Sequence, residues 1–200
     1  MTTQSHAKLV IQDRDRAIFD FLGKFKVATT SQIEREFFMK QQQKQSLWLA
    51  QRRLKKLHEA KYLVRQRNHL NDEYAYSLKK YKQIDHQVAL VEFYLTLKKY
   101  GRINEFTPEK TMGDIRPDAV CEIYVPQKGT YFFCVEVEMS NNRFNQDKYE
   151  KFYYSRAYKK WFPVTFPKIV IICDRTIKIK PSRVNYVQIP TNLKGIEKIF

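Results

Sequence analysis

The sequence predicts an α+β fold built from two domains, residues 1–80 and 84–200. Apolar residues recur at helical spacing through the first sixty residues, whereas alternating and continuous apolar runs, typical of strands, dominate beyond Gly101. A chain of 200 residues, 43% of them hydrophobic, is long enough to bury a core and is not disordered. We therefore expect a helical N-terminal domain followed by an α/β domain.

Several protein classes are excluded by composition. No window of eighteen uncharged apolar residues exists, so no membrane span is expected, and the first residues lack a signal-peptide pattern. The cysteines form no CxxC pair and argue against a disulfide framework or a zinc cluster; they are Cys121, Cys134 and Cys173. These features predict a cytoplasmic protein with no membrane partner.

Three helices are expected in the first domain. The first begins near Asp13, and its apolar stripe consists of Ile18, Phe21, Leu22 and Phe25. The second begins at residues 30–31, where Ser31 and Glu34 have the spacing of a capping box. The third covers residues 45–60, with an inner face formed by Leu47, Ala50, Leu54 and Leu57. Residues 62–67 and 74–78 alternate around an Asn/Asp-rich centre, which predicts a β-hairpin.

Positive charge concentrates around the third helix. The chain has 37 basic and 21 acidic residues, a net charge of +16. Residues 40–67 hold nine bases and one acid, and this net +8 is half of the total. So large an excess favours a polyanionic partner, and nucleic acid is the usual one.

Three helices with a basic third helix, followed by a hairpin, predict a winged helix-turn-helix that places this helix in the major groove of double-stranded DNA. Gln45 and Arg52 have side chains suited to base edges. Phosphate contacts are expected from Lys44, Arg53, Lys55 and Lys56, and from Arg65 and Arg67 on the wing. The alternative is an amphipathic helix that packs on another protein and leaves its charges solvated.

The second domain is expected to follow the order αβββαβ. A long helix covers residues 84–100 and is followed by strands at 102–106, 117–125 and 131–139. A helix at 142–160, a buried strand at 168–173 and a last strand at 186–189 complete it. This order predicts a sheet that is covered on at least one face.

Acidic side chains share one face of the predicted sheet. Glu136 and Glu138, two residues apart on a strand, point the same way, and Asp118 lies on the preceding strand. If the two strands pair as a hairpin, Asp118 comes near Glu136. Such oxygens could hold Mg²⁺ and a phosphate. A solvated sheet edge explains the same pattern, so both interpretations stand.

These residues and their order resemble a known family. Glu92, the pair Pro117-Asp118, and Glu136 match the PD-(D/E)XK nuclease-like pattern of a helix acid, Pro-Asp, and an acid on the next strand. Over roughly residues 10–175 the chain resembles the replication-relaxation family of plasmid and mobile-element proteins, in which a winged helix precedes such a domain. The supporting stretches are residues 52–57, 62–65, 85–90, 116–119 and 135–140, followed by Lys148 and Lys151.

The resemblance implies a double-stranded-DNA-binding accessory protein of plasmid replication, relaxation or conjugative mobilisation, with relaxase or replication proteins as partners. The family pattern has lysine two residues after Glu136, where this chain has Glu138, which favours an absence of nuclease activity and of any cofactor. The alternative is a Mg²⁺-dependent endonuclease with Asp118, Glu136 and Glu138 as metal ligands and catalytic groups, and Lys148 or Lys151 as the missing cation. A third interpretation is a winged-helix transcriptional repressor. Because winged helices commonly bind paired half-sites, a homodimer is also expected.

Overall fold

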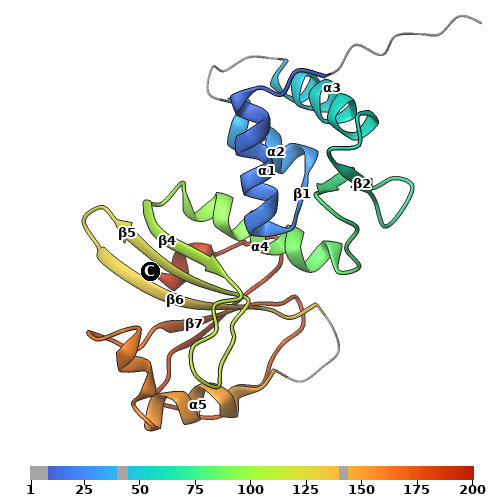
Figure 1. Cartoon of the computed structure of the whole chain (residues 1–200). Helices are drawn as coiled ribbons and strands as arrows, with labels where there is room; N and C mark the ends of the chain where they lie inside the picture. Colours follow the sequence, from blue (N-terminus) through green and yellow to red (C-terminus); the bar gives the residue numbers. More distant parts are fainter. Residues whose placement is uncertain (1–8, 40–44, 140–143) are drawn as a thin grey trace, which may run out of the picture. The chain divides into compact units, whose positions relative to one another are not determined.

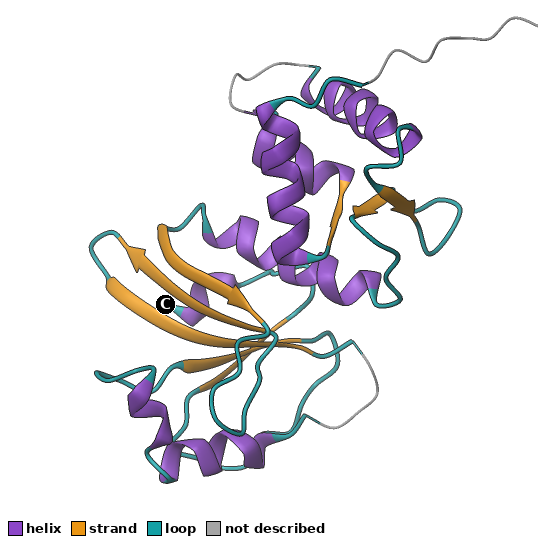
Figure 2. Cartoon of the chain, viewed as in Figure 1, coloured by secondary structure: helices purple, strands orange, loops and turns teal. Residues whose placement is uncertain are grey.

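The computed structural model describes residues 9–39, 45–139 and 144–200, and its mixed helices and two sheets confirm the α+β class (Figures 1 and 2). The chain divides into two compact units, Met1–Val88 and Ala89–Phe200. The division falls inside α4, Ile84–Leu97, a few residues beyond the expected 80/84 junction. The first turn of α4 belongs to the N-terminal unit because Ile84 packs against Val27 and Ala75, and Gln32 Nε2 donates to the Val88 carbonyl at 2.9 Å.

The N-terminal unit contains three helices and a small antiparallel sheet. Its elements are α1 Asp13–Phe25, β1 Val27–Thr29, α2 Thr30–Phe37, α3 Ser46–Glu59, β2 Val64–Gln66 and β3 Ala75–Ser77. The strands lie in the order β1-β3-β2. The hairpin β2–β3 confirms the prediction, whereas β1 was not predicted, because three residues are too few to show an alternating pattern.

The start of α2 differs from the prediction. Its N-cap is Thr29 rather than Ser31, and the partner in the capping box is Gln32. The Thr29 hydroxyl accepts from the Gln32 amide at 3.2 Å, and Gln32 Oε1 accepts from the Thr29 amide at 3.1 Å. Ser31 instead binds Glu73, its amide donating at 2.6 Å, so the loop before β3 is tied to the first turn of α2.

The inner face of α3 is buried as expected at three of its four positions. Ala50, Leu54 and Leu57 are fully buried, but Leu47 in the first turn is 43% exposed. Helical periodicity gives the direction of a side chain and not whether another element lies there. The helix start is joined to α2 by a hydrogen bond from the Ser46 hydroxyl to Glu34.

The C-terminal unit is a mixed sheet with the order β4-β5-β6-β7-β8. The first three strands are antiparallel, and β7 and β8 run parallel to β6. The strands are β4 Arg102–Pro108, β5 Ala119–Val125, β6 Gly129–Val137, β7 Lys168–Ile172 and β8 Tyr186–Ile189. All five were expected, with ends that shift by a few residues.

The expected helix at 142–160 consists of two pieces within its described part. The first is α5 Gln146–Tyr154, and the second is the 3₁₀ helix η2 Ala157–Lys160. Between them Arg156 has a left-handed backbone with φ of 57°, which ends the α-helical hydrogen bonding. Residues 142–143 lie outside the described residues.

The C-terminal unit buries both faces of its central strands. On one face Cys134, Ile169 and Ile171 form a core with Tyr149 and Phe152 of α5, which covers that face (Figure 1). Since side chains alternate along β6, Glu136 points to the same face as Cys134 and meets α5. On the other face the ring of Phe133 lies 6.0 Å from that of Phe200. Within the described chain, no helix has the length and apolarity needed to cross a membrane.

Candidate functional site

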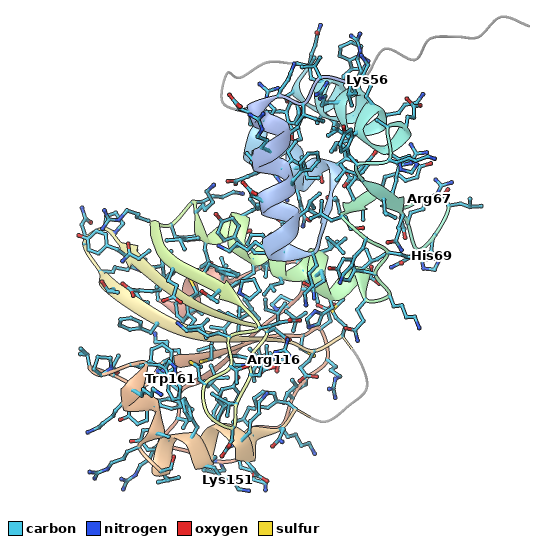
Figure 3. All side chains as sticks on the ribbon, in the orientation of Figure 1. Lys56, Arg67, His69, Arg116, Lys151 and Trp161 are labelled. Atoms are coloured by element: carbon cyan, nitrogen blue, oxygen red, sulfur yellow. The ribbon has the colours of Figure 1, made fainter. Side chains whose placement is uncertain are left out.

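The outward face of α3 carries exposed cations. Arg52, Lys55 and Lys56 are all exposed, whereas Leu54 and Leu57 on the other side of the helix are buried. Figure 3 labels Lys56 on α3. The Arg52 guanidinium lies 5.2 Å from the ring centroid of Trp48, which is itself 52% exposed. Lys55 reaches Glu59 across one turn at 3.7 Å, a contact between two exposed side chains that contributes little to stability. The face is therefore basic and open to solvent in the N-terminal unit.

The start of this face is only partly described. Gln45 is the N-cap of α3 and is exposed, but its side chain makes no capping hydrogen bond. Lys44, which we expect to contact phosphate, lies outside the described residues. On the strand side, Arg65 lies in β2 and Arg67 directly follows it.

Arg53 does not belong to this outward face. Its Nε donates to Asp15 Oδ1 at 2.8 Å, its Nη2 donates to the Val10 carbonyl at 2.8 Å, and Nη2 also binds Asp15 Oδ2. Asp15 is fully buried, and its Oδ2 accepts the Gln12 amide at 2.7 Å. Burial raises the pKa of Asp15, but the hydrogen bonds from Arg53 and Gln12 outweigh burial and hold it below its ordinary value. We therefore correct the assignment of Arg53 from phosphate contact to a structural ion pair between α3 and α1.

In the C-terminal unit the strand register brings two acids together. Strands β5 and β6 pair as the expected hairpin, with Ala119 opposite Val135. Extending this register by one residue places Asp118 opposite Glu136. Asp118 Oδ2 accepts a hydrogen bond from the Val137 amide at 2.7 Å. The negative charge of Asp118 also contributes to raising the pKa of Glu136. The two acids therefore lie side by side at one end of the strand pair.

Glu136 is also held by the first turns of α5. Asn145 caps this helix by accepting the Lys148 amide at 3.3 Å, which puts Lys148 and Tyr149 at its start. Lys148 Nζ lies 2.6 Å from Glu136 Oε1, and the Tyr149 hydroxyl donates to the same oxygen. Glu136 is only 7% exposed. Burial raises its pKa, and this effect outweighs the positive charge of Lys148, which lowers it.

Glu138 and Lys151 lie apart from this acid pair. The Glu138 carboxylate pairs with Arg175 at 3.9 Å. Lys151 lies on α5 (Figure 3) and, with Lys148, lines a pocket of about 500 Å³ that also contains Asp114 and Asp147. Among the described residues, no three His, Cys, Asp or Glu side chains gather as metal ligands, so the triad of Asp118, Glu136 and Glu138 that the endonuclease alternative requires is not formed.

The acid pair alone would have to hold any magnesium ion at this place. Mg²⁺ commonly takes one or two carboxylates and completes its shell with water and phosphate oxygens. Asp118 and Glu136 would supply those carboxylates. The amine of Lys148 lies where it can balance negative charge beside them.

Comparison with protein-family models, curated proteins and solved structures finds no significant match to this chain.

Two contributors to these sites were not predicted. Tyr149 is fully buried in the core, and its hydroxyl also binds Glu136. A tyrosine directly beside Lys148 at the start of the helix was the only signal. Asp15 gave no signal, because the partner of a buried charge is decided by tertiary packing.

Replacing Glu136 by glutamine is expected to raise the melting temperature by a few degrees at pH 7. Because burial raises the folded-state pKa of Glu136, its protonated form favours folding below the unfolded pKa of about 4.3, and this advantage is lost as the pH rises through the folded value. Thermal unfolding at pH 7 and pH 4 should show the gain at pH 7 only. Glu138→Gln, two residues further along the chain, is the control and should show no such gain. A lower melting temperature for Glu136→Gln at pH 7 would mean that the bond to Lys148 outweighs the cost of burial.

Proposed function

We propose that this protein is a double-stranded-DNA-binding accessory protein of plasmid or mobile-element replication, relaxation or conjugative mobilisation. Its N-terminal unit acts as a winged helix-turn-helix, with α3 as the recognition helix and β2–β3 as the wing. The order of helices and strands and the antiparallel sheet β1-β3-β2 support this assignment. The assignment to mobile elements rests on the family resemblance of the motifs.

The observation that carries the proposal is the exposed basic face of α3. A major groove about 12 Å wide admits one helix, and a recognition helix needs outward side chains that reach bases and phosphates. Arg52 and Lys56 meet this requirement, because both are exposed and no contact to a described carboxylate restrains either side chain. Arg65 and Arg67 extend the positive charge to the wing.

Duplex binding as a function of salt tests the proposal. We expect fluorescence anisotropy to show binding to a random-sequence duplex at 50 mM salt, with affinity that falls linearly with salt concentration on logarithmic axes. Each neutralised phosphate should contribute a slope of about −0.9. Binding without salt dependence, or no binding at low salt, would contradict the proposal. Footprinting on plasmid DNA would then show whether the protected site is an origin or, as for a repressor, a promoter.

A second candidate function is a Mg²⁺-dependent endonuclease. It is favoured by the convergence of Asp118, Glu136 and Lys148, since a lysine beside two acids has the chemistry of a phosphodiester-cleaving site. A bound Mg²⁺ would polarise a phosphate oxygen and activate water. Lys148 would stabilise negative charge on the phosphate, the role that the family pattern gives to the lysine replaced here by Glu138.

Incubation of supercoiled plasmid with the protein and Mg²⁺ separates the two functions. We expect no nicking, because Glu136 Oε1 already accepts hydrogen bonds from Lys148 and Tyr149, and protonation is favoured by burial. Nicking that requires Mg²⁺ and is lost in Asp118→Ala and Lys148→Ala, but kept in Lys151→Ala, would establish the endonuclease instead. Equal loss in all three variants would point to impaired folding or DNA binding.

A further inference from the structure

A hollow in the N-terminal unit lies where the carboxyl end of α3 meets the wing. It has a volume of about 540 Å³, and its polar lining residues are His58, Arg65, Gln66, Arg67, Tyr74 and Lys80. We refer to it as the wing hollow. Two arginines and a lysine are among its lining residues, and none of the described residues that line it carries a carboxylate. The wing hollow is therefore strongly electropositive.

The pocket of the C-terminal unit is different in charge. Its lysines, Lys148 and Lys151, share the walls with Asp114 and Asp147, and Lys148 is already bound to Glu136. An anion entering that pocket would meet carboxylates as well as cations. Of these two spaces, only the wing hollow has the one-sided charge that an anionic group requires.

Tyr74 holds both arginines of the wing hollow. Arg65 and Arg67 are two residues apart on an extended segment, so their side chains project to the same face. The guanidinium carbon of Arg65 lies 4.2 Å from the centroid of the Tyr74 ring, and that of Arg67 lies 4.9 Å away. Both distances are within the range of cation–π attraction. One aromatic ring thus restrains two flexible cationic side chains before any ligand arrives.

Further contacts stiffen this arrangement. Arg67 Nη1 donates to the Leu70 carbonyl at 2.6 Å, which closes the turn of the wing. Gln66, between the two arginines, also lines the hollow, and its side-chain amide exchanges hydrogen bonds with the Tyr81 backbone at 3.0 Å. At the helix end, His58 Nδ1 donates to the Leu63 carbonyl at 2.9 Å. The walls are therefore fixed from α3, from β2 and from the segment that follows β3.

We propose that the wing hollow holds a single backbone phosphate of the DNA, with Arg65 and Arg67 as donors and Tyr74 as the positioning residue that orients them. This inference rests on the proposed DNA-binding function and adds to it a specific site and a role for Tyr74. Guanidinium groups suit the site because their planar forks can each give two parallel hydrogen bonds to phosphate oxygens. Phosphate contacts carry no sequence information, so this site raises affinity for every duplex alike.

Three variants of Tyr74 and Arg65 test the inference by duplex binding. Tyr74→Leu removes the ring but keeps an apolar side chain, and we expect it to weaken binding roughly fivefold or more. Tyr74→Phe keeps the ring and should bind as the unchanged protein does. Arg65→Lys keeps the charge but loses the planar fork, so it should weaken binding to a similar extent while the slope of the salt dependence stays the same.

Two readouts separate positioning from a general loss of structure. The double variant Tyr74→Leu, Arg65→Lys should lose less affinity than the product of the two single-variant losses, because both substitutions disturb one site. The affinity ratio between a preferred and a random duplex should not change, because only phosphate is contacted. If Tyr74→Leu unfolds, the Arg65→Lys variant and Arg67→Lys decide the question by themselves.

The outcomes distinguish the wing hollow from the proposed function. If the duplex binds and Arg52→Ala weakens binding, while Tyr74→Leu and both arginine-to-lysine variants bind normally, the wing hollow is not a phosphate site and the DNA-binding function stands. The inference would also be overturned if the double variant lost affinity by the full product of the two single losses. A changed affinity ratio between the preferred and the random duplex would overturn it too. If the unchanged protein binds no duplex at low salt, the proposed function itself fails.

Discussion

Replacing Arg53 by alanine is expected to destabilise the N-terminal unit by about 3–5 kcal/mol, because it leaves the fully buried carboxylate of Asp15 without its charged partner. This loss is large beside the 5–15 kcal/mol by which domains are typically stable. Urea unfolding monitored by circular dichroism measures it. Arg52→Ala is the matched control, because the neighbouring arginine is exposed and should change stability by less than about 0.5 kcal/mol.

The pH dependence gives this prediction a second test. The folded pKa of Asp15 lies below its unfolded value of about 3.9, so its stabilising contribution is present above that value and is lost as the pH falls through the folded pKa. The difference in stability between the unchanged protein and Arg53→Ala should therefore shrink in strong acid. The double variant Asp15→Asn, Arg53→Ala should recover part of the loss, because no charge is left buried. Equal stability of Arg52→Ala and Arg53→Ala would contradict the structural role of Arg53.

Removing Arg52 and Lys56 together is expected to weaken duplex binding by roughly tenfold or more. Because Lys56 is the phosphate contact of the two and Arg52 is suited to a base edge, the slope of log affinity against log salt should also become shallower by about 0.9. Fluorescence anisotropy over a range of salt concentrations measures both quantities. Unfolding of the double variant should match that of the unchanged protein, because both side chains are exposed.

A control variant that loses the same two positive charges elsewhere shows whether binding depends on the face of α3 or on net charge alone. Lys24→Ala with Lys26→Ala removes the same two charges from the end of α1 and its C-cap. If α3 enters the groove, this control should reduce affinity much less than the double variant of α3. Equal losses in the two variants would mean that binding follows the net charge of +16 rather than a dedicated face.

Much of the fold was predictable because local patterns determined it. The apolar spacing of α3, the Asn/Asp-rich turn between β2 and β3, and the continuous run of β7 each identified an element to within a few residues. Strand β1 was missed because its three residues depend on pairing with β3, more than forty residues away. The break at Arg156 was missed because a left-handed arginine carries no sequence signal comparable to glycine.

The candidate sites depended more strongly on three-dimensional contacts. Alternation along β6 predicted one face for Glu136 and Glu138. In the structure Glu136 contacts Lys148 of α5, whereas Glu138, which follows the strand, pairs with Arg175. Similarly, the helical periodicity of α3 predicted a basic outer face but not which of its arginines would pair with a neighbouring helix.

The sequence by itself determined the α+β class, the order of the elements and the concentration of positive charge around α3, because periodicity and charge are local properties of the chain. Only the tertiary structure decided that Arg53 is bound to Asp15 while Arg52 stays in solvent, and that Tyr74 gathers Arg65 and Arg67 at one hollow. The reason is physical: the role of a charged side chain depends on which groups surround it after folding, and those groups come from residues distant in the sequence.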